Sequence, residues 1–146
     1  MRKKYTSQCS KQQSKIVSQD RGQVKHVALN TTGDEVAQYH IDDPQILGNN
    51  NSCCDYLIFN DSKKRAYFIE LKGRDLCKAK SQVLDAENLF VSDLTGYTRF
   101  YRIVYRTGSH RVQNQAIIQW KRLCGKEDGI PVVVIKQGKY EESIDS

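Results

Sequence analysis

The sequence predicts a mixed α/β fold in which a central β-sheet is flanked by helices. Two apolar runs with strand character enclose a polar turn near the middle of the chain. Amphipathic and apolar segments then alternate, which indicates helix, strand, helix and strand in that order. The expected ranges are 54–59 and 66–72 for the hairpin, 76–90 and 112–124 for the helices, and 97–105 and 131–135 for the later strands.

The chain before the hairpin is predicted from weaker patterns. Residues 24–29 alternate apolar and polar side chains and are expected to form a strand. Residues 35–41 fit either a strand or a short helical piece, and residues 14–19 fit a turn of helix. An Asp-Asp-Pro sequence at 42–44 then interrupts regular structure.

The hairpin and the helix after it have the clearest patterns. Both faces of the hairpin carry apolar side chains, so we expect it to lie centrally in a sheet that is covered on both sides. Asp75 is the type of residue that caps a helix at its first turn. The helix that follows has one apolar stripe, formed by Leu76, Ala79, Val83, Ala86 and Phe90. In the second helix, the residues expected to face the core are Ala116, Ile117, Trp120 and Leu123.

The net charge of +6 is concentrated at the beginning of the chain. The first 25 residues contain seven basic residues and one acidic residue, and the rest of the chain contains sixteen of each. Such a basic arm attracts phosphate backbones without reading sequence, although a solubilising tail explains it equally well. We expect a basic segment over 1–22 that can be flexible, one domain over 23–139, and a polar tail over 140–146. The basic residues are Arg2, Lys3, Lys4, Lys11, Lys15, Arg21 and Lys25.

Cysteine usage and hydropathy argue against several classes of protein. The five cysteines are odd in number and have no C-x-x-C spacing, so neither a disulfide framework nor a zinc site is expected. No apolar stretch approaches the roughly 20 residues that span a bilayer. The basic start lacks the apolar core of a signal peptide. We expect a cytoplasmic protein with no membrane partner.

Three ionisable residues on the hairpin form the candidate site. Glu70 and Lys72 are two residues apart, so they share one face of their strand. If the turn is centred between residues 62 and 63, the register sets Asp55 directly opposite Glu70. Opposed Cβ atoms in such a pair lie about 4.5–5.5 Å apart. Two carboxylates this close repel each other unless a cation lies between them.

This arrangement favours a divalent cation. Magnesium binds one or two carboxylates and completes its shell with waters and phosphate oxygens. Lys72, on the same face, is then placed to contact a scissile phosphate or to activate the attacking water. The alternatives are an ordinary ion pair between Glu70 and Lys72, and an Asp55 that only caps a loop. The apolar side chains of Ala66 and Phe68 on the same face argue against the ion pair.

Asp55, fourteen intervening residues and then Glu70-Leu71-Lys72 resemble the D…ExK signature of the PD-(D/E)XK nuclease superfamily. The resemblance covers roughly residues 35–105, and Cys54 stands where the family pattern has its proline. It implies a restriction endonuclease-like core and hydrolysis of DNA phosphodiester bonds with Mg²⁺ or Mn²⁺. Asp55, Glu70 and the backbone carbonyl of Leu71 would be the metal ligands.

The resemblance also implies roles for further residues. Lys72 would be the catalytic base or charge stabiliser, and Gln82 resembles a glutamine that some members carry on the helix after the motif. Many members use one more acidic residue upstream, for which Glu35 is the first candidate and Asp42 or Asp43 the next. A homodimer or a partner subunit is also implied.

A second hypothesis assigns the same fold but no catalytic activity. A catalytically inactive nuclease-like domain could bind nucleic acid or a partner protein through the basic residues from Arg2 to Lys25. It predicts no metal binding but a salt-sensitive association. An enzyme with a reactive thiol is disfavoured, because no cysteine can be placed beside a histidine from the sequence.

Overall fold

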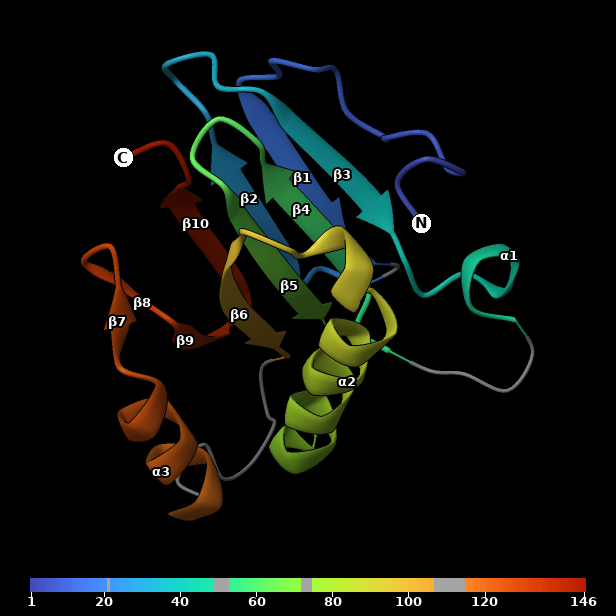
Figure 1. Ribbon diagram of the computed structural model, residues 1–146. Helices are drawn as coiled ribbons and strands as arrows, with labels where there is room; N and C mark the ends of the chain where they lie inside the picture. Colours follow the sequence, from blue (N-terminus) through green and yellow to red (C-terminus); the bar gives the residue numbers. More distant parts are fainter. Residues whose placement is uncertain (21, 49–52, 72–74, 107–114) are drawn as a thin grey trace.

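A five-stranded sheet forms the centre of the computed structural model, which describes residues 1–146 except 21, 49–52, 72–74 and 107–114. In sheet order the strands are β3 (Val36–His40), β4 (Tyr56–Asn60), β5 (Arg65–Leu71), β6 (Thr98–Tyr105) and β9 (Val133–Gln137). Strands β3, β4 and β5 are antiparallel neighbours, and β5, β6 and β9 are parallel neighbours (Figure 1). This confirms the predicted α/β class, and it settles residues 35–41 as a strand.

A second sheet of three strands was not expected. Its order is β1 (Lys15–Gln19), β2 (Lys25–Leu29) and β10 (Lys139–Ser143), with β2 antiparallel to β1 and parallel to β10. The predicted helical turn at 14–19 is therefore wrong, because alternating burial of Ile16 and Ser18 makes this segment a strand. The segments assigned to a flexible arm and a polar tail both contribute strands to the fold.

In the sequence, the two longer helices lie between parallel strands of the main sheet. Helix α2 (Leu76–Leu89) joins β5 to β6, and its N-cap is Asp75 as predicted, whose side chain accepts hydrogen bonds from the N–H groups of Cys77 and Lys78. The remaining elements are α1 (Pro44–Leu47), the 3₁₀ turn η1 (Val91–Asp93), α3 (Gln115–Cys124), and a small hairpin of β7 (Lys126–Glu127) and β8 (Ile130–Pro131). No helix in the described part of the chain is long and apolar enough to cross a membrane.

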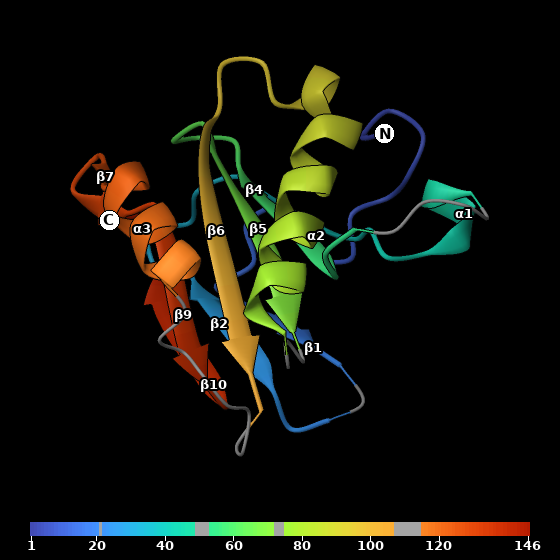
Figure 2. The same ribbon diagram turned by 90° about the horizontal axis from the view of Figure 1, so that it is seen from below.

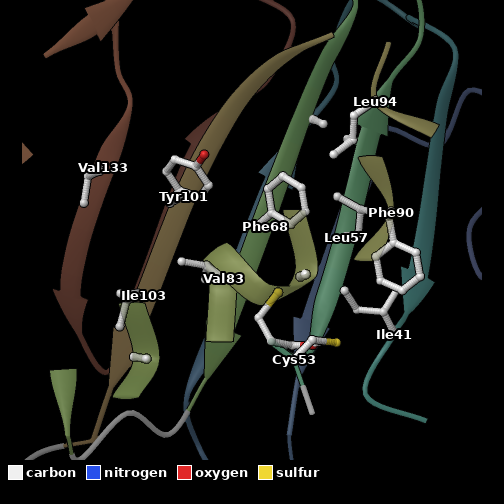
Figure 3. Packing of buried hydrophobic residues seen from close by; sticks show 14 of the residues in the cluster. Ile41, Cys53, Leu57, Phe68, Val83, Phe90, Leu94, Tyr101, Ile103 and Val133 are labelled. Carbon is white, nitrogen blue, oxygen red and sulfur yellow. Dashed lines mark hydrogen bonds between the residues drawn. The ribbon is translucent and has the colours of Figure 1, made fainter. Parts of the chain in front are cut away.

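The predicted stripe of α2 is buried against one face of the main sheet. Figure 3 shows Val83 of this helix over the strand residues Leu57, Phe68 and Tyr101. The helix runs along the sheet, and α3 lies beside β9 (Figure 2). In α3 only part of the expected inward face is covered, because the helix sits at the margin of the sheet. Ile117 and Trp120 are buried, whereas Ala116 and Leu123 are exposed.

The other face of the main sheet is covered by the second sheet and not by helices. Ile58, Tyr67 and Ile69 of the hairpin pack there against Ile16 of β1 and Ala28 of β2. The predicted central position of the hairpin is therefore confirmed, since all seven residues of β5 are buried. The expected cover is present on both faces, and in the described part of the chain the helices supply it on one face and the second sheet on the other.

A buried charge network ties the two sheets together. The carboxylate of Glu142 on β10 accepts hydrogen bonds from Arg102 on β6, at 2.7 Å and 3.1 Å, and lies 2.7 Å from Nε2 of His26 on β2. Arg102 and His26 are both 0% exposed. Burial raises the pKa of Glu142, but the partners His26 and Arg102 outweigh it and hold that pKa below its ordinary value.

Several strand ends meet at one end of this sandwich. Strands β5, β6 and β9 finish there, and β4, β2 and β10 begin there (Figure 1). We call it the Leu71 end, after the last residue of β5. The opposite end, where the hairpin turns between Asn60 and Arg65, is called the turn end.

Candidate functional site at the Leu71 end

The register of the hairpin is the one predicted from the sequence. Phe59 is paired with Ala66, and Tyr56 is paired with Ile69. One step further along the same register sets Asp55 opposite Glu70. Both positions have the parity of the strand residues that face α2, so the two carboxylates belong to the helix-covered face.

Asp55 is fixed against the end of β5 by a hydrogen bond. Its Oδ2 accepts from the backbone N–H of Leu71 at 2.7 Å, and its own carbonyl accepts from the N–H of Ile41 at 3.0 Å. The side chain is half-buried. Asp55 therefore binds the end of the neighbouring strand, which differs from the loop cap considered as an alternative, and it lies opposite Glu70 in the extended register.

Glu70 is a buried carboxylate near the end of β5, the central strand of the main sheet. Only 6% of the residue is exposed. Its partner on the β6 side is Ile103, and the next residue on its own face of β5 is Phe68. An ionised carboxylate in such surroundings is costly unless other groups or a cation compensate its charge.

The surroundings of Cys53 show how acidic this end is. The pKa of its thiol is raised to about 12, first by burial and then by the negative charges of four carboxylates. Those carboxylates belong to Asp42, Glu70, Asp55 and Asp85. Asp42 is joined directly to Asp55, because its backbone N–H donates to the carbonyl of Asp55 at 3.4 Å.

Glu35, the first candidate for the upstream acid, lies at the wrong end of the sheet. Its carbonyl accepts from Asp61 in the hairpin turn at 2.7 Å, and its carboxylate lies 3.5 Å from the Nζ of Lys11. Strand β3 runs between Glu35 and Asp42, so these acids are separated by roughly 20 Å. Asp42 is therefore the candidate at the Leu71 end, and Asp43 is engaged as the N-cap of α1.

Gln82 lies close to the start of β4. Its backbone carbonyl accepts from the N–H of Cys54 at 3.2 Å, and its side chain is half-buried. Lys78, one turn earlier on α2, is exposed. The helix thus brings the position predicted from the family pattern to the residue that precedes Asp55.

Two predicted residues fall outside the described part of the chain, namely Lys72 and Arg21. The carbonyl of Leu71 belongs to the peptide that it shares with Lys72. The roles predicted for these groups therefore stay predictions.

The basic residues near the beginning of the chain do not act as one group. The guanidinium of Arg2 binds both carboxylate oxygens of Asp61 at 2.7 Å each and stacks 4.1 Å from the centre of the Phe59 ring. It is a structural residue of the turn end. The exposed members of the predicted set are Lys3, Lys4, Lys11 and Lys15.

Sequence reasoning missed a second cluster at the Leu71 end. Lys25, the last of the predicted basic residues, lines a cavity together with Arg106 and Lys139. No local pattern joins these three residues, because they come from three separate segments. Only the unexpected pairing of β10 with β2 brings Lys139 beside Lys25.

The donor set of the acidic site fits a hard cation. Two neighbouring carboxylates with a backbone carbonyl and waters are ligands that Mg²⁺ accepts. In the parts of the chain that the structure describes, no group of three or more His, Cys, Asp or Glu side chains is arranged to hold a metal. The fit therefore rests on Asp55 and Glu70 alone.

We compared the chain with models of protein families, with curated proteins and with solved structures, and found no match in any of the three.

Proposed function

We propose that the chain is a metal-dependent nuclease that hydrolyses DNA phosphodiester bonds, with Asp55 and Glu70 as the carboxylates that hold the metal. The observation that carries this proposal is the register of β4 and β5. It sets the two carboxylates opposite each other, at the end of a buried hairpin and on the face covered by α2. Ordinary strand pairs do not place two acids in this way, because their repulsion destabilises the sheet.

The order of elements around the site supports the same proposal. The hairpin of β4 and β5 carries Asp55 at its start and Glu70 near its end, α2 follows, and β6 returns parallel to β5. The PD-(D/E)XK core that the resemblance implies has a helix, the motif-bearing hairpin, a second helix and a further strand. The last three parts occur here in that order, whereas the described chain before the hairpin contains three strands and only the four-residue helix α1. A restriction endonuclease-like core is therefore part of the proposal.

The chain's own groups would prepare the site as follows. The N–H of Leu71 holds Oδ2 of Asp55 and so fixes the orientation of that carboxylate. Glu70 is held rigidly because its strand is paired on both sides. When bound by these residues, Mg²⁺ or Mn²⁺ supplies Lewis acidity toward a phosphoryl oxygen and lowers the pKa of a ligated water. Lys72 would contact the scissile phosphate or accept a proton from the attacking water, and Gln82 would help to orient the substrate.

The second candidate function is a nuclease-like fold that binds nucleic acid without cutting it. One observation favours it: the hydrogen bond from Leu71 gives Asp55 a structural role that needs no metal. This reading predicts that the association with DNA survives replacement of both acids and does not depend on Mg²⁺.

Cleavage assays separate the two functions. Supercoiled plasmid and branched oligonucleotides are incubated with Mg²⁺ or Mn²⁺ and the purified wild type, Asp55→Asn or Glu70→Gln. We expect cleavage by the wild type only, with both variants still folded by circular dichroism. Glu127→Gln, an exposed acid on β7, is the matched control and should cut normally. Cleavage by Glu70→Gln at the wild-type rate would eliminate the proposed mechanism.

A further inference from the structure

A cavity of about 590 Å³ opens at the Leu71 end, on the side of the second sheet. Three of the residues that line the cavity are cationic, and no lining residue is acidic. The lining residues are Gly22, Gln23, Val24, Lys25, Arg106, Gly138 and Lys139.

The cations are held in place by the backbone. Lys25 and Lys139 are register partners on the adjacent parallel strands β2 and β10. The N–H of Lys25 donates to the carbonyl of Gly138 at 3.2 Å, and the N–H of Gly138 donates to the carbonyl of Tyr105 at 2.7 Å. Arg106 follows Tyr105 directly, so one short chain of hydrogen bonds joins the three segments that supply the charges.

These charges have few partners of their own. Among the residues that the structure describes, neither Lys25 nor Arg106 forms an ion pair, and Lys139 lies 3.5 Å from Glu141, which does not line the cavity. Like charges on opposed strand positions destabilise a sheet. An anion in the cavity would remove this repulsion between Lys25 and Lys139.

Gly22 makes room for the guanidinium of Arg106. A Cβ atom at position 22 would lie 2.7 Å from Nη2 and 3.2 Å from Nε of Arg106. The N–H of Gly22 donates to Oδ1 of Asp20 at 2.8 Å, and that oxygen lies 3.2 Å from the same Cβ position, so one carboxylate is near this side of the guanidinium. The planar guanidinium of an arginine presents paired donors that bind phosphate in bidentate fashion.

We propose that this cavity binds a phosphate group of the nucleic-acid substrate, in addition to the phosphate that is cut, through Lys25, Arg106 and Lys139. This inference rests on the proposed nuclease function for the identity of the substrate. Arg106 lies one strand over from Glu70 and three residues beyond its partner Ile103, so their Cα atoms are roughly 11 Å apart. The cavity and the acidic pair are on opposite faces of the main sheet. A nucleic-acid strand bound to both would therefore cross the ends of β5 and β6.

Binding without cleavage tests the cavity separately from the chemistry. Fluorescent oligonucleotides are titrated with protein in EDTA, and the affinity is measured by anisotropy at several salt concentrations. We expect Arg106→Gln and Lys139→Gln each to weaken binding roughly five- to tenfold. Each should also reduce the slope of log affinity against log salt by about one. Lys126→Gln removes the same charge from β7, at the start of the chain segment that leads into β9, and should leave affinity and slope unchanged.

Oligonucleotides with and without a terminal phosphate show whether the cavity binds a terminal phosphate or an internal phosphodiester. If the cavity holds a terminal phosphate, a 5′- or 3′-phosphorylated strand binds more tightly than the matching hydroxyl strand, and Arg106→Gln abolishes the difference. If it holds an internal phosphodiester, both strands bind alike and Arg106→Gln weakens both equally. Competition by inorganic phosphate that is lost in Arg106→Gln supports the cavity in either case.

The experiments distinguish a failure of the proposed phosphate site from a failure of the proposed nuclease activity. If Arg106→Gln and Lys139→Gln both bound the oligonucleotide with the affinity and salt slope of the wild type, the proposed phosphate site would be refuted. This would hold even if Glu70→Gln had lost cleavage. Conversely, a protein that never cuts DNA but loses affinity in these two variants would keep the cavity and refute the nuclease. Lys139 is exposed, so its replacement is not expected to disturb folding, which circular dichroism checks.

Discussion

Oδ2 of Asp55 accepts a hydrogen bond from the backbone N–H of Leu71 at 2.7 Å, so the acid before β4 is fastened to the last residue of β5. This contact holds the strand ends together where the regular pairing of the hairpin stops. It also keeps the carboxylate beside Glu70, its neighbour in the extended register.

Asp42 and Glu35 are expected to differ sharply in their effect on cleavage. Asp42 is bonded through its backbone to Asp55, whereas Glu35 lies at the turn end beside Lys11. We predict that Asp42→Asn lowers the cleavage rate at least tenfold at limiting Mg²⁺, because it removes negative charge near Asp55 and Glu70, the proposed metal ligands. Glu35→Gln should cut at the wild-type rate. A loss of cleavage in Glu35→Gln alone would show that the wrong acid has been assigned.

The buried network around Glu142 is expected to be a major source of stability. Glu142→Gln leaves the fully buried Arg102 without its carboxylate partner. Breaking a buried ion pair in this way costs about 3–5 kcal/mol of unfolding free energy, which urea denaturation would measure as a lower midpoint at constant slope. Glu141→Gln, at the exposed neighbouring position of β10, should change stability by less than about 0.5 kcal/mol. Equal midpoints for the two variants would refute the role of the network.

Asp145 is expected to make stability depend on pH in the acid range. Burial raises its pKa, but hydrogen bonds from the N–H and hydroxyl of Thr32 and the hydroxyl of Ser143 outweigh burial and lower the pKa to about 2, from an ordinary value of 3.8. Because the folded value is the lower one, the stabilisation is complete above about pH 3.8 and is lost as the pH falls toward 2.

Thermal unfolding between pH 4 and pH 2 tests this prediction. Wild-type stability should fall over this window, and Asp145→Asn should lose part of that dependence. Ser143→Ala, which removes one of the donors, should have an intermediate effect. If the stability of Asp145→Asn depended on pH as steeply as that of the wild type, Asp145 would not be the source of the pH dependence.

Arg2 is expected to support the fold rather than to bind nucleic acid. Its guanidinium makes two bonds of 2.7 Å to Asp61 and covers the ring of Phe59. Since the pair is partly exposed, Arg2→Gln should lower the unfolding free energy by only about 1–2 kcal/mol. Lys3→Gln, at the exposed next residue, is the matched control and should be neutral. Urea denaturation measures the unfolding free energy of both variants. A larger loss in Lys3→Gln than in Arg2→Gln would refute the structural role of Arg2.

Local patterns were sufficient to predict the centre of the fold. The polar turn and the apolar faces on both sides fixed the register of β4 and β5, and with it the position of Asp55 relative to Glu70. Asp75 followed by an apolar stripe predicted α2 and its cap. In each case the information lies within a few residues of the element, where turn chemistry and periodicity act.

The second sheet could not be predicted in this way. Strand β10 carries Glu141 and Glu142 in succession, which is typical of a polar tail. Glu142 is buried only because Arg102 and His26, far away in the sequence, compensate its charge. The choice between Glu35 and Asp42 failed for a related reason: the pattern over 35–41 fitted a strand or a helix, and only a strand separates these acids by the length of the sheet.

Calorimetric titration of Mn²⁺ into the wild type and Asp55→Asn is the most direct test of the acidic pair. We predict one binding event in the wild type and an affinity at least tenfold lower in Asp55→Asn, with Glu127→Gln unchanged as the charge-matched control. Binding of Mn²⁺ by Asp55→Asn with wild-type affinity would show that the carboxylates of Asp55 and Glu70 do not hold a metal together.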